Sequence, residues 1–486
     1  MSKEILELEP KALWKHFYSL TQIPRPSKKE GKVIEFMKKF GEDLGLETIV
    51  DEVGNVIIKK PATEGMENRK GVILQGHLDM VPQKNADTDH DFEKDPIDAY
   101  IDGEWVTARG TTLGADNGMG VAAAMAVLES KELVHGPVEA LFTIDEETGM
   151  TGAENLKPGL LDGDILLNMD SEDEGELYIG CAGGVNTNGQ REYKEEEVPA
   201  DTVAFKVSVK GLKGGHSGLD IHLGRGNANK IMNALLTTAA AKYGLRVAEI
   251  SGGNLRNAIP REAFATVVVP SDKKELFEKF AEEFDALVKD EFKDTDAGVE
   301  VSIEETAMPA KVIDEESQNA MFKAVADCPN GVIAMSKEVE GIVETSTNLA
   351  IVKSENGIIE IATLQRSLVD EGKDKLAADV RAAFENAGFK AESSGDYPGW
   401  KPNPDSPILK EMKEIYNNKF GKVPEVKVIH AGLECGLLGS VYTNWDMISF
   451  GPTIRSPHSP DEKVNINTVQ KFWDFLVETL KNVPEK

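Results

Sequence analysis

The stretch Ile73–Pro82, "ILQGHLDMVP", ends an apolar run with an imidazole and a carboxylate two residues apart. The run predicts a buried strand, and His77 and Asp79 lie on the same side of an extended chain because its side chains alternate. Two later apolar runs, "VEALFTIDEE" and "DILLNMD", also end in acids, at 145–147 and at Asp170. In open α/β sheets, ligands bind beyond the carboxyl ends of the strands. We therefore expect these polar ends to converge on one edge of a sheet.

Helices and strands alternate around this stretch. Helical spacing predicts helices over 10–17 and 27–44, and Ser27 and Glu30 fit a capping box at the start of the second. A third helix is expected over 117–130, directly after a glycine-rich turn. This alternation predicts an α/β fold in which helices surround a mixed sheet.

The pattern changes from about Thr202, where strands and helices follow one another in two similar series. We interpret the series as two related α+β lobes, over about 200–305 and 306–395, which form one inserted domain. The predicted organisation is a catalytic domain in two parts, with the inserted domain between them. Its boundaries are 1–184, 185–395 and 396–486.

The composition excludes several classes of partner. The 54 basic and 84 acidic residues give a net charge of −30, which repels nucleic acid and anionic membrane surfaces. The three cysteines, Cys181, Cys328 and Cys435, are too few and too dispersed for a disulfide framework. The longest apolar run, "GVAAAMAVL", is far shorter than a membrane span. We therefore expect a soluble, cytoplasmic protein.

Five residues have the chemistry of metal ligands, since borderline divalent cations bind imidazole nitrogen and carboxylate oxygen. A two-metal site needs one carboxylate that bridges ions about 3.5–4 Å apart, with further ligands for each ion. Asp116 in the glycine-rich turn is the predicted bridge. His77 and Asp170 would complete one ion's ligands, and Glu147 and His458 those of the other.

Two acidic residues remain outside this ligand set, and each suits a catalytic task. A metal-binding imidazole usually donates its second N–H to a carboxylate, so Asp79 is the expected orienting partner of His77. Glu146 lies next to a predicted ligand but points elsewhere. We expect it to act as a general base that takes a proton from water.

Other interpretations of these residues fit less well. A single histidine at a strand end is usually structural, and adjacent glutamates usually form a solvated loop. A calcium loop that starts at Asp170 would place Cys181 where the bidentate glutamate belongs. "GHSGL" lacks the last glycine of a nucleophile elbow, and "GLKGGHS" lacks the lysine of a phosphate loop. Cys435 with His430 is a further, weaker candidate, as a thiol and imidazole pair.

Seven motifs together resemble one known family. They are "GHLDMVP", "GADNGMG", "DEETGMTGA", "NMDSEDEGE", "GGHSG", "HAGLECG" and "GPTIRSPHSPDE". In this order they resemble the di-zinc aminopeptidase, carboxypeptidase and aminoacylase family, and most closely its aminoacyl-histidine dipeptidase branch. The resemblance extends from Trp14 to Trp473. Asp170 is a position where some members have Glu, and Asp there goes with dipeptidases and aminoacylases.

The resemblance implies roles for individual residues. It implies the same five zinc ligands, Asp79 as orienting residue and Glu146 as general base. It also implies that the inserted lobes form a lid, from which His216 reaches the site to stabilise the oxyanion. The implied binding residues for the substrate carboxylate are Asn257, Asn348, Arg366, Gly432 and Glu434.

These inferences predict an enzyme that hydrolyses dipeptides, especially Xaa-His dipeptides such as β-alanyl-histidine. Two Zn²⁺ ions per chain are the expected cofactors, and Mn²⁺ or Co²⁺ would suit the same ligands. The alternatives are an N-acyl-amino-acid deacylase or carboxypeptidase with the same site and, less well supported, a metal-binding scaffold without turnover. The resemblance is compatible with a homodimer.

Overall fold

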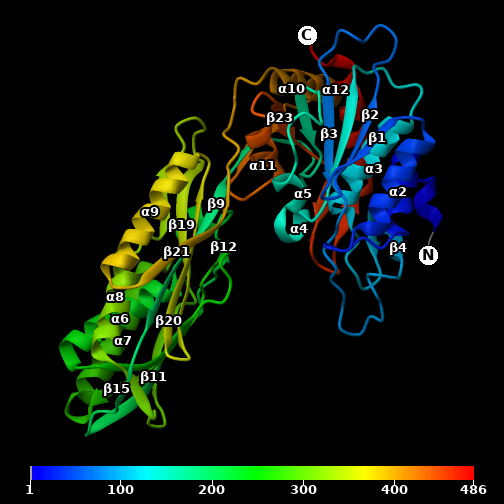
Figure 1. Cartoon of the computed structure of the whole chain (residues 1–486). Coiled ribbons are helices and arrows are strands. Elements are labelled where there is room, and N and C mark those ends of the chain that lie inside the picture. Colours follow the sequence, from blue (N-terminus) through cyan, green and yellow to red (C-terminus); the bar gives the residue numbers. More distant parts are fainter. Residues whose placement is uncertain (1–2) are drawn as a thin grey trace. The chain divides into compact units, whose positions relative to one another are not determined.

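The structure is a computed structural model that describes residues 3–486, and the chain folds into two compact units (Figure 1). Unit 1 holds the chain up to Gly180, together with Pro402–Val428 and Leu433–Lys486. Unit 2 holds Cys181–Lys401 and the short segment Ile429–Gly432. The expected insertion, 185–395, lies within unit 2, whose main segment is slightly longer at both ends.

Unit 1 is built on a mixed sheet. Within the described chain this sheet has eight strands, in the order β1-β2-β6-β3-β7-β23-β8-β22. The strands are β1 Glu47–Val50, β2 Val56–Lys60, β3 Val72–His77, β6 Val138–Thr143, β7 Ile165–Asn168, β8 Glu176–Cys181, β22 Glu425–Ile429 and β23 Asp446–Ser449. The mixed sheet and surrounding helices expected from the sequence are thus confirmed.

The centre of this sheet explains the continuous apolar runs in the sequence. Every residue of β3, β6 and β7 is buried, as is typical of parallel strands covered on both faces. β3 runs parallel to both β6 and β7, and β23 runs parallel to β7. The carboxyl ends of these strands therefore meet at one edge of the sheet.

Helices pack around the sheet of unit 1. They are α1 Lys11–Thr21, α2 Gly31–Asp43, α3 Ala115–Glu129, α4 Glu146–Gly149, α5 Thr151–Glu154, α10 Pro407–Phe420, α11 Glu434–Val441 and α12 Ile466–Asn482. α3 packs against both α1 and the central strand β3. Since nearly all of α3 is buried, it shows no polar face.

The predicted capping box at the start of α2 is wrong. The helix begins at Gly31, and the side chain of the N-cap residue Glu30 accepts no hydrogen bond from the first main-chain N–H groups of the helix. The Ser27 hydroxyl instead donates to Oδ2 of Asp79 at 2.8 Å. Oε1 of Glu30 accepts from the main-chain N–H groups of Lys28 and Asp145. Both side chains thus support loops at the edge of the sheet.

A second, smaller sheet of unit 1 joins two distant parts of the sequence. Its order is β24-β25-β5-β4, from Ile454–Arg455, Lys463–Asn465, Trp105–Ala108 and Ala99–Asp102. β25 pairs with β5, and the loop that carries His458 connects β24 to β25. This pairing holds the His458 loop beside the segment that leads into α3.

Unit 2 contains one antiparallel sheet, which has nine strands within residues 3–486. They are β9 Gly183–Glu192, β11 Thr202–Lys210, β13 Arg246–Gly252, β15 Ala263–Pro270, β16 Glu300–Glu305, β18 Gly331–Met335, β19 Val343–Glu355, β20 Ile358–Ser367 and β21 Lys390–Tyr397. β13 and β19 pair through Ser251 with Lys353 and Gly252 with Val352. The two expected lobes therefore share a single sheet. Two short pairs, β10 Glu195–Glu197 with β17 Lys311–Ile313 and β12 Gly215–His216 with β14 Ala258–Ile259, lie outside it.

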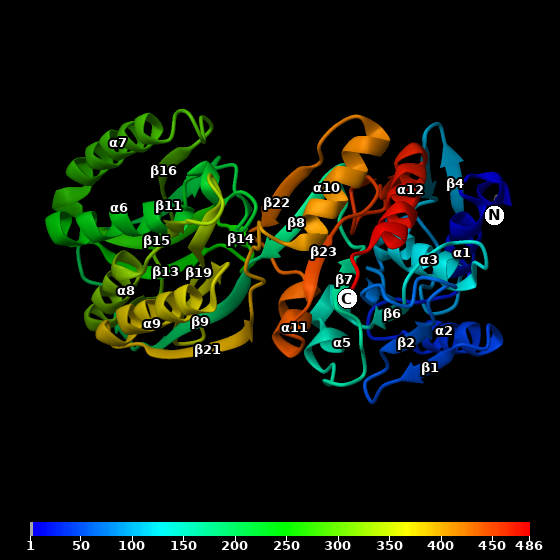
Figure 2. The same ribbon diagram turned by 90° about the horizontal axis from the view of Figure 1, so that it is seen from above.

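Four helices cover one face of this sheet (Figures 1 and 2). They are α6 Ala228–Tyr243, α7 Lys274–Glu291, α8 Glu315–Asp327 and α9 Asp370–Asn386. The side chain of Asn227 caps α6 by accepting from two main-chain N–H groups, and Gly244 ends the helix in the left-handed conformation. One hydrophobic core includes residues from both expected lobes.

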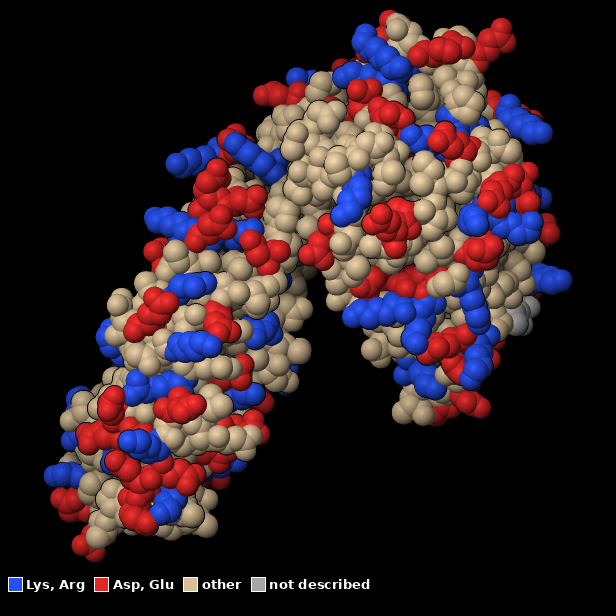
Figure 3. All heavy atoms as spheres, viewed as in Figure 1, with Lys and Arg blue, Asp and Glu red and all other residues tan. Residues whose placement is uncertain are grey.

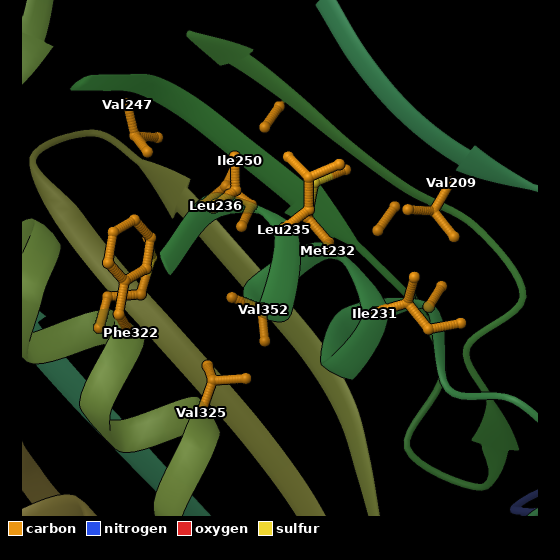
Figure 4. Packing of buried hydrophobic residues seen from close by; sticks show 14 of the residues in the cluster. Val209, Ile231, Met232, Leu235, Leu236, Val247, Ile250, Phe322, Val325 and Val352 are labelled. Atoms are coloured by element: carbon orange, nitrogen blue, oxygen red, sulfur yellow. The ribbon is translucent and has the colours of Figure 1, made fainter. Parts of the chain in front are cut away.

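Figure 4 shows how this core is built. Met232 and Leu235 of α6 pack with Val247 and Ile250 of β13 and with Phe322 of α8, all of them at least 96% buried. Each fully buried side chain of this size contributes about 1.5–3 kcal/mol to folding. Helix α6 from the first expected lobe and helix α8 from the second thus stabilise the same sheet.

The chain has an excess of acidic residues, with 84 Asp and Glu against 54 Lys and Arg. On the face shown in Figure 3, basic side chains are interspersed among the acidic ones, so the negative charge forms no single large patch there. Across residues 3–486, no helix combines the length and apolar character required to cross a bilayer.

Candidate active site

His77 is the last residue of β3, and its side chain is almost completely buried among carboxylates. Its Nε2 atom lies 3.1 Å from Oδ1 of Asp116 and 3.4 Å from Oδ1 of Asp170. Oε2 of Glu146 lies 3.9 Å from the same nitrogen. These acids come from the start of α3 and the loops after β6 and β7, so the edge of the sheet gathers them as expected.

His458 completes a second group of ligand atoms. Its Nε2 atom lies 2.9 Å from Oε2 of Glu147 and 3.3 Å from Oδ2 of Asp116. The residue is half-exposed and has a positive φ of 60°, an uncommon conformation for a residue with a side chain. Asp116 therefore directs one carboxylate oxygen toward each histidine.

The described residues include four groups of side chains that could hold a cation, and two of these groups share Asp116. His77, Asp116 and Asp170 form one group, and Asp116, Glu147 and His458 form the other. In each group the ligand atoms lie within 4.8 Å of one another. Oε1 of Glu147 and Oδ1 of Asp170 are buried and have no hydrogen-bond partner among the described residues. Unpaired buried carboxylate oxygens and imidazole nitrogens fit divalent cations well.

The electrostatics of these groups also favour a cation. Burial raises the pKa of Asp170 to about 7, and the neighbouring acids Asp116 and Glu147 raise it against the opposing effect of His77. Hydrogen bonds to Asp116 and Glu147 raise the pKa of His458 to about 11. Without added positive charge, so many carboxylates in a buried space favour protonation, and a bound divalent cation removes that penalty.

Asp79 contacts both His77 and the loop after β6 that carries Glu146 and Glu147. Its Oδ1 atom lies 3.3 Å from Nδ1 of His77 and accepts the main-chain N–H of Glu146 at 3.0 Å. Oδ2 accepts the Ser27 hydroxyl at 2.8 Å and the main-chain N–H of Glu147 at 3.3 Å. Burial opposes ionisation, but these hydrogen bonds and the His77 charge lower the pKa of Asp79 to about 2. An ionised Asp79 can therefore orient His77 and fix the loop after β6.

Glu146 begins the short helix α4, directly after Asp145 in the left-handed conformation. Its side chain is 15% exposed, and the 3.9 Å to His77 exceeds hydrogen-bonding distance. Burial raises the pKa of Glu146 well above its ordinary value, and Asp170 and Glu434 raise it against the effect of His77. A partly accessible carboxylate with a raised pKa is suited to accept and return a proton.

The acid Glu462 has a role that the sequence did not reveal. It is 2% exposed, and its carboxylate accepts four main-chain N–H groups. The donors are Leu113 at 2.7 Å, Gly114 at 2.9 Å, Ala115 at 2.8 Å and Asp116 at 3.1 Å. Glu462 is the last residue of the motif that contains His458, but its hydrogen-bond partners are main-chain atoms far away in the sequence and leave no local pattern.

Glu434, an expected substrate-binding residue, is completely buried in unit 1. Its Oε2 atom accepts from Nε2 of Gln75 at 2.6 Å and from the Thr143 hydroxyl at 2.8 Å. Burial raises its pKa to about 8, and Asp170 and Asp79 raise it against the effect of His77. Glu434 therefore supports the ends of β3 and β6 and offers no exposed atom to a substrate in this structure.

The other expected substrate residues lie in unit 2, with His216. His216 is in the short strand β12, and Asn257 immediately precedes the paired strand β14. The main-chain N–H of Ser217 donates to the carbonyl of Asn257 at 2.8 Å. The amide of Asn348 donates to the carbonyls of Arg256 at 3.0 Å and Ala258 at 2.7 Å. Asn348 therefore positions the loop beside His216.

The hydrogen bonds of His216 determine which ring nitrogen carries its proton. Nδ1 accepts main-chain N–H groups from Gly218 at 3.1 Å and Leu219 at 3.0 Å. Burial and the nearby Arg366 lower the pKa of His216 to about 4, so the ring is neutral at pH 7. With Nδ1 as an acceptor, the neutral ring must carry its hydrogen on Nε2. His216 is thus a hydrogen-bond donor at Nε2.

Arg366 is buried in the same region of unit 2. Its Nε atom donates to the Ser217 hydroxyl at 3.4 Å, and Nη1 donates to the Tyr397 hydroxyl at 3.0 Å. His216 and Asn257 line a pocket of about 730 Å³. Unit 2 therefore brings together His216, Asn257, Asn348 and Arg366, and Gly432 belongs to the short segment of the same unit.

His430, the imidazole of the alternative thiol and imidazole pair with Cys435, is poorly suited to activate a thiol. The ring of His430 is buried, and its Nε2 atom lies 2.8 Å from the Ser346 hydroxyl. Burial and the nearby Arg366 lower the pKa of His430 to about 3. An imidazole with so low a pKa is a poor base for a thiol.

A full-length relative of this chain is the cytosol non-specific dipeptidase of Escherichia coli strain K12. It is 47% identical over 483 residues, which cover 99% of this chain and 100% of the relative. The crystal structure of aminoacylhistidine dipeptidase from Vibrio alginolyticus matches with a TM-score of 0.94 and 50% identity, and covers 100% of this chain and 99% of that chain.

A more distant structure shares the fold. Aminopeptidase PepT from Bacillus cereus matches with a TM-score of 0.56 at 16% identity, and covers 98% of this chain and 99% of that chain. Residues 73–482 match the sequence model of peptidase family M20/M25/M40. This range includes the five candidate ligands. The chain belongs to peptidase family M20/M25/M40, whose members are metal-dependent peptidases.

Proposed function

We propose that this chain is a dipeptidase that uses two divalent cations, most simply Zn²⁺. The observation that carries the proposal is the position of Asp116, with Oδ1 3.1 Å from His77 and Oδ2 3.3 Å from His458. A carboxylate that faces two ligand groups at once is what a pair of cations requires. His77 and Asp170 would hold one ion with it, and Glu147 and His458 the other.

The reaction would begin with a proton transfer to Glu146. The two cations, when bound, supply Lewis acidity that polarises a peptide carbonyl and acidifies water. Glu146 accepts a proton from the attacking water, because its raised pKa makes it a stronger base than an ordinary carboxylate. It then returns the proton to the leaving amine. Asp79 holds His77 and the main chain of Glu146 in place throughout.

His216 would stabilise the negative charge that develops on the carbonyl oxygen. Its Nε2 carries a hydrogen, because Nδ1 accepts from two main-chain N–H groups. A preorganised donor of this kind is worth about 10²–10³ in kcat. Unit 2 would then act as the lid that the resemblance implies.

The substrates we propose are small dipeptides without a blocked N-terminus, including Xaa-His dipeptides. The names of the E. coli and V. alginolyticus relatives support this class. Arg366 and Asn257, near His216, are the candidates for binding the substrate carboxylate. The expected cytoplasmic location has the support of the E. coli relative's name, and the homodimer stays a prediction.

The experiment that tests the function measures turnover and metal content together. The purified protein is stripped with a chelator, reconstituted with Zn²⁺, Mn²⁺ or Co²⁺, and assayed with Xaa-His dipeptides, N-acyl amino acids and longer peptides. We expect two metal ions per chain by elemental analysis and the highest kcat/KM on dipeptides. A preference for N-acyl amino acids or longer peptides would favour the deacylase or carboxypeptidase alternative. Stable metal binding without any turnover would identify a scaffold.

A further inference from the structure

A short turn at the start of α3 carries the bridging candidate Asp116 and is held from two sides. Glu462 accepts the four consecutive main-chain N–H groups of residues 113–116 at 2.7–3.1 Å. Arg25 approaches the same turn from its carbonyl side, where Nη2 donates to the carbonyl of Gly114 at 2.5 Å. Both charged side chains are 2% exposed.

Arg25 also holds the strand end that carries His77 and Asp79. Its Nη1 donates to the carbonyl of Leu78 at 2.9 Å and to that of Asp79 at 3.0 Å. The guanidinium therefore joins the loop after β3 to the turn before α3. A planar group with several donors in a fixed geometry can do this, whereas a single ammonium cannot reach the same set of acceptors.

The packing around Arg25 leaves little room for the turn to shift. A Cβ atom on Gly114 would lie 2.6 Å from Nη2 of Arg25, and one on Gly118 would lie 2.8 Å from the same atom. Gly114 also has a positive φ of 72°, which residues with a side chain rarely adopt. The two glycines thus allow the buried guanidinium to lie against the turn.

Neither charge is explained by stability alone. A buried ion is costly, and a hydrophobic replacement of similar volume is often as stable or more so. Arg25 and Glu462 direct polar side-chain atoms to main-chain groups that carry or adjoin two candidate ligands, His77 and Asp116. The turn they hold is the one whose position determines whether Asp116 can face both groups of ligands.

We propose that Arg25 and Glu462 are positioning residues that hold Asp116 in its bridging position before any cation binds. The proposal rests on the two-cation function proposed above. It identifies a part of the site beyond the ligands, and Arg25 lies outside residues 73–482, the range that matches the family. Since Asp116 is shared, a displaced turn must weaken both cation sites together.

The test uses Glu462→Gln, because the amide keeps the size of the side chain but replaces one acceptor oxygen with a donor. Two of the four N–H groups then lose their partner. Arg25→Lys is the second variant, since it keeps the charge and loses the fixed geometry. The matched controls are Glu7→Gln, in an exposed pair with Lys11, and Arg109→Lys, whose side chain is 62% exposed.

Full-length apoproteins are titrated with Co²⁺ and followed by visible absorption, while a separate melt records the thermal stability of each apoprotein. We expect Glu462→Gln and Arg25→Lys to bind both equivalents of Co²⁺ about 10–100-fold more weakly, the usual effect of losing support for a ligand. Their kcat should recover in excess metal. His458→Ala, which removes a ligand of one ion only, should weaken mainly one equivalent.

The outcomes separate this proposal from the proposed function. Variants that melt earlier but bind Co²⁺ with wild-type affinity would show a merely structural role and overturn the positioning. Variants that bind only one of the two Co²⁺ equivalents more weakly would also overturn the positioning role. A wild-type protein that binds no pair of cations would overturn the two-cation function itself. If Glu462→Gln does not fold, Glu462→Asp and Arg25→Lys provide the same comparison.

Discussion

Asp79 and Glu146 are joined by a hydrogen bond, in which the main-chain N–H of Glu146 donates to Oδ1 of Asp79 at 3.0 Å. The same oxygen lies 3.3 Å from Nδ1 of His77. One buried carboxylate therefore fixes both a candidate ligand and the backbone of the candidate base. Because only the main chain of Glu146 is involved, its side chain can be changed without loss of this link.

Replacing Glu146 with Gln should reduce kcat by about 10²–10⁴, the usual contribution of a general base. The metal content should stay at the wild-type value, because the amide keeps the size of the side chain and the main-chain bond to Asp79 is retained. Steady-state kinetics with a dipeptide and elemental analysis of the same sample provide the test. A variant with normal metal content and normal turnover would exclude Glu146 as the base.

Replacing Asp79 with Asn should act on the metal rather than directly on the proton transfer. The amide lacks the charge that faces His77, and one of its two ends no longer accepts hydrogen bonds. We expect metal affinity to fall about 10–100-fold, measured by competition with a chelator. Asp43→Asn, a change in an exposed pair with Lys39, is the control. Equal affinities in the two variants would contradict the orienting role.

Replacing Gly218 with Ala should disturb unit 2 and leave the metal centre intact. An added Cβ would lie 2.0 Å from the main-chain oxygen of His430, so the segment that follows His216 must move. We expect kcat to fall at least about 10-fold, because an oxyanion donor depends on its position, while metal binding stays unchanged. Gly31→Ala, where a Cβ meets no atom within 4 Å, is the control. A normal kcat in the Gly218 variant would argue against His216 as a donor.

The buried His430 should make unit 2 less stable in acid. Its pKa is about 3 in the folded chain and about 6.5 when unfolded. Above pH 6.5 both states are neutral and the full stability is present. Below it the unfolded chain binds a proton that the folded chain excludes, so stability is lost progressively down to about pH 3.

The contribution amounts to about 1.4 kcal/mol per pH unit for one proton. The free energy of unfolding of His430→Asn should therefore depend less on pH between 6.5 and 4.5 than that of the wild type, as measured by urea titrations at several pH values. Identical slopes in the two proteins would show that His430 is not held neutral.

Removal of metal should lower the thermal stability of unit 1 and abolish turnover. A cation that binds only the folded chain stabilises it by about 2.7 kcal/mol at a concentration 100 times its Kd. Differential scanning calorimetry of stripped and reconstituted protein would measure the shift. Stripped protein that keeps its activity and melting temperature would contradict a metal centre formed by these carboxylates.

The sequence predicted those site residues that lie at or directly after the ends of strands. Parallel neighbouring strands bring their carboxyl ends together, so apolar runs that stop at His77, at 145–147 and at Asp170 point to a shared location. The mixed sheet of unit 1 could be predicted for the same reason. The expected ligand groups also lie together in the structure, with Asp116 between them.

The sequence could not reveal residues whose hydrogen-bond partners lie far away along the chain. Ser27 and Glu30 fit a local capping pattern, yet their side chains bond to Asp79 and Asp145. Arg25 resembles an ordinary surface charge in sequence, and the motif that ends at Glu462 does not indicate the main-chain partners of its carboxylate. Tertiary contacts bury both side chains. Sequence patterns such as the capping box consider only hydrogen-bond partners a few residues away. The tertiary fold brings these side chains to partners from distant parts of the chain.

The pairing of β13 with β19 has a consequence for how unit 2 can be divided. A cut between 305 and 306 would separate strands that share one sheet and helices that share one core, and would expose the apolar faces of both fragments. We therefore expect neither fragment to fold on its own. Truncation experiments and chimeras will have to exchange this region whole, however clearly its sequence suggests a duplication.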